Sequence, residues 1–129
     1  MKKNFTILLL AAAALTGACA DGRDKKIVEE NAAYAVAQTR VLLANSGAPN
    51  GRNFPRSTRS SDGSFIGTSM YDWTSGFFPG TLWYIHELTG SPVAKGEAEK
   101  WTGALDSLKT YRGTHDIGFM IYCSFGNAE

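Results

Sequence analysis

Two short clusters carry the residue types from which a sugar-binding or catalytic site could be built. The first runs from Asp72 to Gly80 and places Trp73 beside small residues at a loop-to-helix junction. Sugars present polarised C–H faces that can stack on the apolar face of an indole ring. In the second cluster, residues 114–119, Asp116 follows a histidine and precedes apolar residues. A carboxylate in that setting could transfer protons.

Both clusters also have a purely structural interpretation. Aromatic side chains are most often core residues, which applies to Trp73 and still more to Trp83 and Phe78. An aspartate at the start of a helix is usually a cap, which applies to Asp116. The residues alone leave both interpretations open.

Other chemistries have weaker support in the sequence. The two histidines, His86 and His115, do not pair with a cysteine or another histidine at a metal-ligand spacing. Residues 76–80 are glycine-containing but follow a loop and lack the Lys-Ser/Thr of a phosphate-binding motif. The formal net charge of +1 provides no basic excess for binding nucleic acid. We therefore expect no metal site and no nucleic-acid partner.

Residues 1–18 are predicted to be a lipoprotein-type signal peptide. Two lysines precede an apolar run, residues 5–15, that is too short to span a hydrocarbon core of about 30 Å. The small residues before Cys19 then make that cysteine the predicted lipidation site. Cleavage at an A-x-A-like site ending at Ala20 is the alternative. We expect a lipid-anchored protein of the periplasm or outer membrane or, in the alternative, a soluble periplasmic protein.

The elements that position the two clusters are predicted to be helical. A polar tether, residues 19–26, leads to a helix of about twenty residues from Ile27, because apolar residues recur there at seven-residue spacing. Gly47 is the predicted end of this helix. Residues 47–71 contain too many glycine, proline and polar residues for a long helix or strand, so they are predicted to be a loop that could form a cleft wall.

A helical hairpin is expected after the loop. Its first helix is capped by Asp72 or Thr74 and ends at Gly90. Its second helix starts at Ser91-Pro92 and has an apolar side. The residues assigned to that side are Val93, Trp101, Leu105 and Leu108.

Asp116 opens a last, very apolar segment, residues 117–125, which contains Cys123. With Cys19 acylated or removed, Cys123 is predicted to be a small buried hydrophobic residue. No later segment covers these apolar residues, so we expect the chain to be the N-terminal part of a larger protein.

Residues 72–83, 87–90 and 115–120 together resemble the unsaturated glucuronyl hydrolases, glycoside hydrolase family 88. The W-T-x-G-F motif paired with H-D-I-G-F is more specific than either motif alone, and the resemblance extends over residues 27–129. It implies an all-α fold, the N-terminal part of an (α/α)₆ barrel, with about two of six helical hairpins present. The unsaturated rhamnogalacturonyl hydrolases, which share this fold, are the nearest alternative family.

The resemblance also implies an activity. Enzymes of this family act on oligosaccharides that polysaccharide lyases release, and here the expected partner is a glycosaminoglycan-type oligosaccharide. An acid protonates C4 of the 4,5-unsaturated uronate at the non-reducing end, and water adds at C5. The resulting hemiketal opens and releases the rest of the sugar. No metal or organic cofactor is implied.

Three residues receive roles from the resemblance. Asp116 matches the first of two essential aspartates, which binds the hydroxyls of the unsaturated ring and tunes its partner aspartate. Trp73 matches the aromatic residue that packs against that ring. His115 is assigned a supporting role in substrate binding.

The second aspartate, the general acid and base, is expected beyond Glu129, so the chain alone is predicted to be inactive. Asp106 is predicted to be a surface residue. A lipid-anchored glycan-binding protein without catalysis is the alternative from another functional class.

Overall fold

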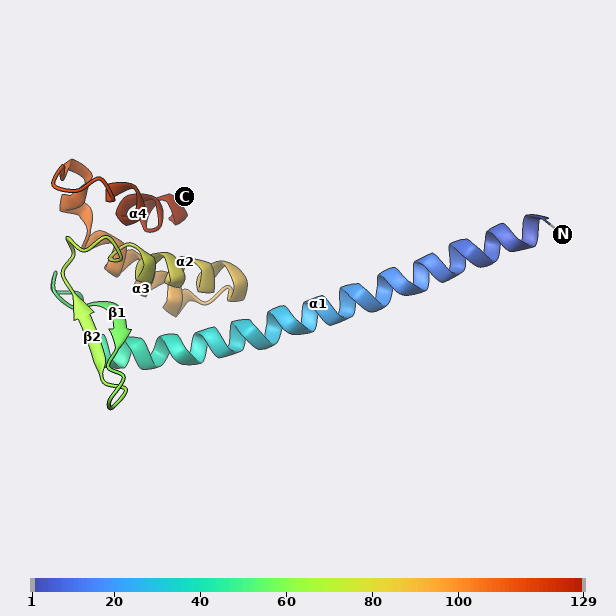
Figure 1. Cartoon of the computed structure of the whole chain (residues 1–129), viewed down its shortest axis with the longest axis horizontal. Helices are drawn as coiled ribbons and strands as arrows, with labels where there is room; N and C mark the ends of the chain where they lie inside the picture. Colours follow the sequence, from blue (N-terminus) through green and yellow to red (C-terminus); the bar gives the residue numbers. More distant parts are fainter. Residues whose placement is uncertain (1, 129) are drawn as a thin grey trace. The chain divides into compact units, whose positions relative to one another are not determined.

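The structure, a computed structural model, describes residues 2–128, with side chains from Gly22 onward. The chain divides into two compact units, residues 1–34 and 35–129. Figure 1 labels the elements of both units along the chain. The predicted lipidation of the Cys19 side chain, and residues 1 and 129 of the predicted segments, lie outside the described part.

The first helix, α1, is longer than the sequence predicts. It spans Lys2–Ser46, so residues 19–26, expected to be a tether, are continuous with it. Ion pairs between residues four positions apart, Lys25–Glu29 and Lys26–Glu30, lie on its surface at 3.9 and 3.7 Å. Within residues 2–128, no helix is both long and apolar enough to cross a membrane.

The predicted end of α1 is confirmed. Gly47 has a φ of +67°, and its N–H donates to the Leu43 carbonyl at 3.0 Å, which is the left-handed cap expected of glycine. The Asn53 side chain donates to the carbonyls of Ser46 and Ala48 at 2.6 and 2.7 Å. These bonds use carbonyls at and just beyond the helix end and hold the next segment of chain against it.

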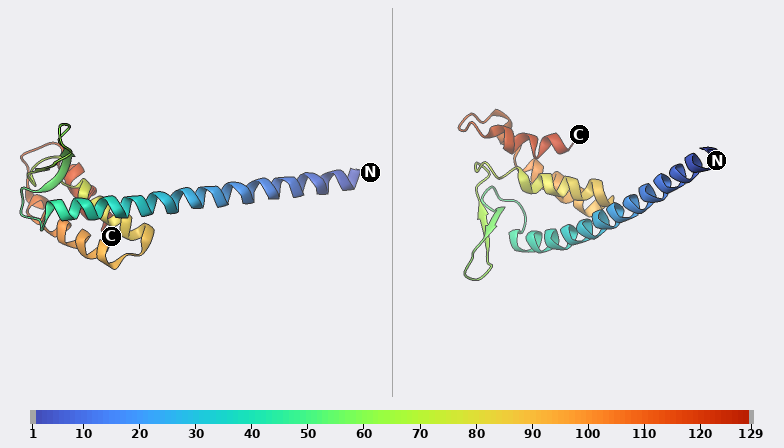
Figure 2. Two further views of the ribbon diagram at one scale, coloured as in Figure 1. Left: turned by 90° about the horizontal axis from the view of Figure 1, so that it is seen from below. Right: turned by 45° about the vertical axis from the view of Figure 1, so that its right-hand side comes forward.

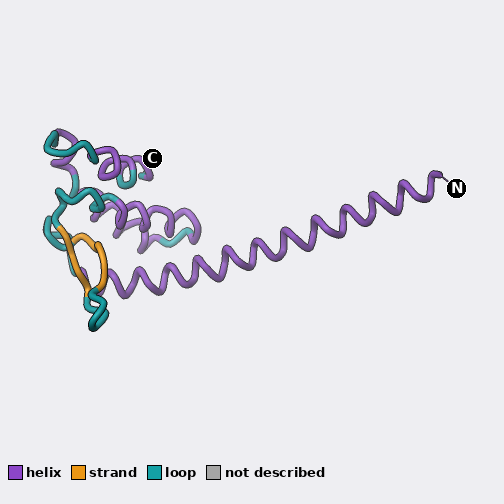
Figure 3. The backbone as a smooth tube through the Cα atoms, viewed as in Figure 1, coloured by secondary structure: helices purple, strands orange, loops and turns teal. Residues whose placement is uncertain are grey.

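The predicted loop, residues 47–71, contains a β-hairpin that the sequence analysis missed. Strand β1 (Phe54–Thr58) pairs antiparallel with β2 (Phe65–Thr68), drawn as orange strands in Figure 3. Apolar–polar alternation does not indicate the strands, because β1 has one fully buried residue, Phe54, followed by half-buried Pro55 and three exposed polar residues. The register shifts between Pro55 and Ser57, which leaves Arg56 as the extra residue of a β-bulge.

The expected helical hairpin is present. It consists of α2 (Phe77–Thr89) and α3 (Pro92–Gly103), which pack along each other in both views of Figure 2. Gly90 ends α2 with a φ of +67°, and the Ser91 hydroxyl caps α3 by accepting from the Ala94 N–H at 3.3 Å. A link of two residues therefore reverses the chain, as the sequence predicts.

Several details of the hairpin differ from expectation. Neither Asp72 nor Thr74 caps α2, because that helix begins later, at Phe77. Val93, expected on the apolar side of α3, is 72% exposed. Leu105 and Leu108 are buried, but they lie after α3, Leu108 in a short 3₁₀ helix, η1 (Asp106–Thr110).

The last segment is a short helix, α4 (Ile117–Tyr122), followed by a 3₁₀ turn, η2 (Phe125–Asn127). Cys123 lies between them and is half-buried rather than fully buried. The apolar segment over residues 117–125 is therefore not one continuous helix, because α4 ends before Cys123.

Trp101 is at the centre of the core. Its ring meets those of Phe54 and Phe78 edge to face, with centroids 5.2 and 5.0 Å away. Leu82, from α2, and Met120, from α4, are also fully buried in the same cluster. The β-hairpin, both helices of the α-hairpin and α4 thus share one core, and the chain is mostly helical.

Candidate active site

Three aromatic side chains from the two motifs form one exposed cluster. The ring centroid of Trp73 lies 5.6 Å from that of Phe77 and 5.9 Å from that of Phe119, and each pair meets edge to face. The Phe77 and Phe119 centroids are 6.2 Å apart. All three side chains are exposed, Trp73 at 44%. The structure therefore brings W-T-S-G-F and H-D-I-G-F together, and it leaves Trp73 outside the fully buried core.

The glycines of the first motif explain how α2 and α4 come so close. A Cβ added at Gly76 would lie 2.6 Å from the Phe119 carbonyl oxygen and still closer to that of Met120. At Gly80, one turn later, an added Cβ would overlap the Cys123 carbonyl oxygen. Any side chain at either position would force the backbones apart, so these glycines set the distance between the two motifs.

Asp116 precedes the first residue of α4 but does not cap it. Its side chain makes no capping hydrogen bond, although its backbone carbonyl accepts from the Phe119 N–H at 2.9 Å. The carboxylate is 29% exposed and lies 3.5 Å from Nε2 of His115, whose own side chain is 94% exposed. The helix-cap interpretation of Asp116 therefore lacks its defining contact.

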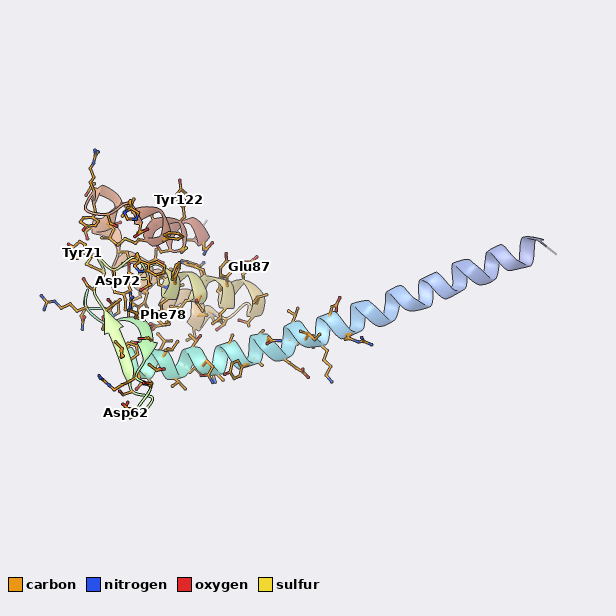
Figure 4. The ribbon with its side chains drawn as sticks, viewed as in Figure 1. Asp62, Tyr71, Asp72, Phe78, Glu87 and Tyr122 are labelled. Atoms are coloured by element: carbon orange, nitrogen blue, oxygen red, sulfur yellow. The ribbon has the colours of Figure 1, made fainter. Side chains whose placement is uncertain are left out.

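The turn that carries Trp73 is held by Asp72, a residue for which the sequence suggested only a helix cap. The Asp72 carboxylate accepts from the backbone N–H of Thr74 at 2.9 Å and from the Thr74 hydroxyl at 2.5 Å. Nη1 of Arg56, from β1, lies 2.5 and 2.6 Å from the two carboxylate oxygens. Figure 4 labels Asp72 near the end of the β-hairpin, beside Tyr71.

Burial and hydrogen bonding act in opposite directions on Asp72. Burial raises the pKa of its carboxyl. The hydrogen bonds from Thr74 and the positive charge of Arg56 lower this pKa, and their combined effect is larger than that of burial. The pKa therefore lies below the ordinary value of 3.8, and Asp72 is a carboxylate at neutral pH. No sequence pattern links Arg56 to Asp72, because the bulge that allows their contact is a tertiary feature.

The remaining candidates occupy ordinary positions. Phe78 is buried as predicted, whereas Trp83 is half-buried and donates from Nε1 to the Thr102 hydroxyl at 3.0 Å. Asp106 is on the surface, where it pairs with Lys109 at 2.5 Å. His86, within α2, has its Nδ1 3.0 Å from the Ser91 carbonyl. In the described part of the chain, no three His, Cys, Asp or Glu side chains are grouped so that they could hold a metal ion.

A cavity of about 560 Å³ lies beside α2, and none of the predicted site residues lines it. Glu87 and Lys95 give its wall charges of both signs. The other lining residues are Trp83, Tyr84, His86, Gly126, Asn127 and Ala128.

Comparisons with known proteins show what the whole chain is similar to. An unsaturated glucuronyl hydrolase of Formosa agariphila is 37% identical over 128 residues, which is 97% of this chain and 32% of that enzyme. The chain is related to the unsaturated glucuronyl hydrolases. The chain spans about a third of the length of this curated relative. No protein-family model matches the chain.

A solved structure supports the same relationship. The crystal structure of an unsaturated glucuronyl hydrolase specific for heparin matches with a TM-score of 0.68 and 42% identity, over 78% of this chain and 26% of that one. Its fold is an (α/α)₆ barrel, and the mostly helical chain is consistent with part of such a barrel. The small β-hairpin is an addition to the all-α class that the sequence predicted.

Proposed function

We propose that the chain contributes a substrate-binding wall and one catalytic carboxylate to an enzyme that hydrates unsaturated glucuronyl oligosaccharides. One observation carries the proposal. Asp116 makes no capping bond and lies three residues before Phe119, whose ring packs against the exposed Trp73. An indole suited to ring stacking and a carboxylate free of a capping role thus lie on two segments that meet through the Trp73–Phe119 contact. The relationship to unsaturated glucuronyl hydrolases supports the reaction class.

In this proposal each site residue has a separate role in binding or catalysis. Trp73 packs against the unsaturated uronate ring, while Asp116 binds ring hydroxyls through charge-assisted hydrogen bonds. A proton is delivered to C4, water adds at C5, and the hemiketal opens to release the remaining sugar. In this proposal, a second aspartate outside the present chain delivers that proton. His115, 3.5 Å from Asp116, supports the carboxylate.

The test uses a chimera, because the chain matches 32% of the Formosa agariphila enzyme. This chain replaces the matching third of that enzyme, and loss of the absorbance of the conjugated double bond is followed. Unsaturated disaccharides from heparin, chondroitin and rhamnogalacturonan are compared, which separates the glucuronyl from the rhamnogalacturonyl alternative. We expect the chimera to hydrate a glucuronyl substrate.

Asp116→Asn should lower kcat of the chimera by about 10² to 10⁴, because Asn keeps the shape of Asp but cannot ionise, so the second aspartate, the general acid, loses the charge that keeps it protonated. Trp73→Ala should act mainly through a higher KM. Asp106→Asn is the matched control, since this surface residue pairs only with Lys109. An Asp116→Asn chimera that retained more than about a tenth of the activity would contradict the proposal. A folded chimera that bound the disaccharide without hydrating it would instead favour the glycan-binding alternative.

We also propose that Cys19 is the lipidated N-terminus of the mature protein, located in the periplasm or outer membrane. The supporting pattern is two lysines, an apolar run over residues 5–15 and the small residues that precede Cys19. Palmitate labelling in a bacterial host should therefore depend on Cys19. Label that persisted in Cys19→Ala, or a mature N-terminus at Asp21, would favour ordinary cleavage and a soluble periplasmic protein.

A further inference from the structure

The Trp73 ring has an uneven environment. On one side it meets Phe77 and Phe119, yet 44% of the side chain is exposed, and it is absent from the buried core cluster. Edge-to-face contacts between exposed rings contribute only about 0.5 to 1.5 kcal/mol beyond area burial. Packing alone therefore fixes this indole weakly, and the conformation of the turn that carries it must contribute.

That turn closes around the Asp72 carboxylate. Asp72 accepts two hydrogen bonds from Thr74, so the residues on both sides of Trp73 are joined through a single carboxylate. Backbone bonds from the Asp72 N–H to the Ser69 carbonyl and from the Ser75 N–H to the Asp72 carbonyl, each 3.0 Å, complete the turn. A rotation of the Asp72 side chain would break both Thr74 bonds and release the backbone of Trp73.

Arg56 controls that rotation from the β-hairpin. Its Nη1 contacts both carboxylate oxygens, at 2.5 and 2.6 Å, and lies 3.5 Å from the Thr74 hydroxyl. Arg56 reaches Asp72 as the extra residue of the β1 bulge, between the paired residues Pro55 and Ser57. A bulge re-aims one side chain out of the regular alternation of a strand, and here that side chain is a guanidinium.

We infer that Arg56 is a positioning residue for Trp73: the β1 bulge directs its guanidinium onto the Asp72 carboxylate, and this ion pair fixes the turn that presents the indole. Its importance for catalysis rests on the proposed function, in which Trp73 packs against the substrate ring. The positioning itself is a property of the protein without sugar. The two statements can therefore be tested separately.

The experiment records ¹⁹F NMR spectra of the chain labelled with 5-fluorotryptophan. The chain has three tryptophans, so three resonances are expected, and Trp73→Phe identifies one of them. Arg56→Gln removes the charge, Asp72→Asn removes its partner, and Arg56→Lys restores a cation. Arg59→Gln is the matched control, because Arg59 lies on the same hairpin but bonds to Ser64 at 3.1 Å. Circular dichroism confirms that each variant is folded.

We expect Arg56→Gln and Asp72→Asn to move the Trp73 resonance by more than its line width in the same direction. The resonances of Trp83 and Trp101 should stay in place, and Arg59→Gln should leave all three unchanged. Arg56→Lys should bring the Trp73 resonance back towards its original position, because one ammonium can contact both oxygens as Nη1 does.

Two results would overturn the inference. One is a Trp73 resonance unchanged in folded Arg56→Gln; the other is an equal shift of all three resonances, which indicates a general structural role. If Arg56→Gln does not fold, Asp72→Asn decides, since an unmoved Trp73 resonance in that variant excludes the positioning role. Adding an unsaturated glucuronyl disaccharide to the labelled chimera is a separate arm. If the Trp73 resonance of the chimera does not respond to the sugar but does respond to substitution of Arg56, the proposed function fails and the positioning role stands.

Discussion

The Trp73 cluster is supported by two regions that use different physics. Towards α4, the contact is between backbones: Gly76 and Gly80 bring α2 within van der Waals distance of residues 119–123. Towards the β-hairpin, the contact is between charges, with Arg56 on Asp72. The backbone contact leaves no space for an added side chain. The ion pair is partly exposed to solvent, since the Arg56 side chain is 39% exposed.

The difference shows which kinds of support a sequence reveals. A close backbone approach requires glycine, so the α2–α4 contact leaves a visible trace inside the W-T-S-G-F motif. An ion pair between residues far apart requires only one acidic and one basic residue, which are common on every surface. We therefore expect the two supports to differ in how much stability is lost when each is changed.

The largest effect is expected for Gly76→Ala. The new methyl group would overlap the carbonyl oxygens of Phe119 and Met120, and backbone atoms cannot rotate away as a side chain can. We expect a loss of about 3 kcal/mol in the free energy of unfolding, at the upper end of overpacking effects. Urea denaturation followed by circular dichroism measures it. A loss below about 1 kcal/mol would show that α4 can move aside without cost.

A smaller, pH-dependent effect is expected at Asp72. Its pKa in the folded chain is below the ordinary 3.8, so the ionised carboxylate stabilises the fold. This contribution is fully present above the unfolded pKa and is lost as the pH falls through the folded pKa. At neutral pH, Asp72→Asn should cost about 1 kcal/mol, a modest value because the ion pair is partly exposed.

The measurement for Asp72 is the difference in unfolding free energy between the unmodified chain and Asp72→Asn. That difference should be constant above about pH 5 and shrink below the ordinary pKa of the carboxyl. Asp62→Asn serves as a comparison on the hairpin, since hydrogen bonds from the side chain and backbone of Ser64, rather than an ion pair, lower the pKa of Asp62. A gap at Asp72 that did not change with pH would exclude the ion pair as its origin.

The sequence predicted the parts of the fold that depend on local rules. Gly47 and Gly90 end their helices and Ser91 starts one, because left-handed glycine and a side-chain acceptor act within a few residues. The β-hairpin escaped prediction because Phe54 alone anchors β1 in the core. α2 starts later than the sequence predicts, because Asp72, a residue type that often caps helices, instead bonds Thr74 and Arg56.

The candidate site divides in the same way. The two motifs indicated Trp73 and Asp116, and the structure places the ring of Trp73 against Phe119, on the first turn that follows Asp116. Arg56 could not be found from the sequence, since its role depends on a bulge and on a partner in another segment. The roles of Trp73, His115 and Asp116 towards a substrate stay predictions until the chimera is assayed.

The smallest expected effect is a gain in stability rather than a loss, and it concerns Gly96. Gly96 lies inside α3, and a Cβ built there meets no atom within 4 Å. Glycine in a helix interior is less stable than alanine by about 0.5 to 1 kcal/mol, so Gly96→Ala should stabilise the chain by that amount. Gly76→Ala makes the same chemical change next to the α4 backbone, but at the N-cap position of α2, where alanine is itself less favourable than glycine. A gap between the two variants that exceeds the cost of a cap change, about 2 kcal/mol, therefore reports the contact with α4. Paired thermal melts with matched urea titrations give both values. If Gly96→Ala were as destabilising as Gly76→Ala, alanine would be unfavourable at both sites. The close approach of α2 and α4 would then not be the cause of the stability loss in Gly76→Ala.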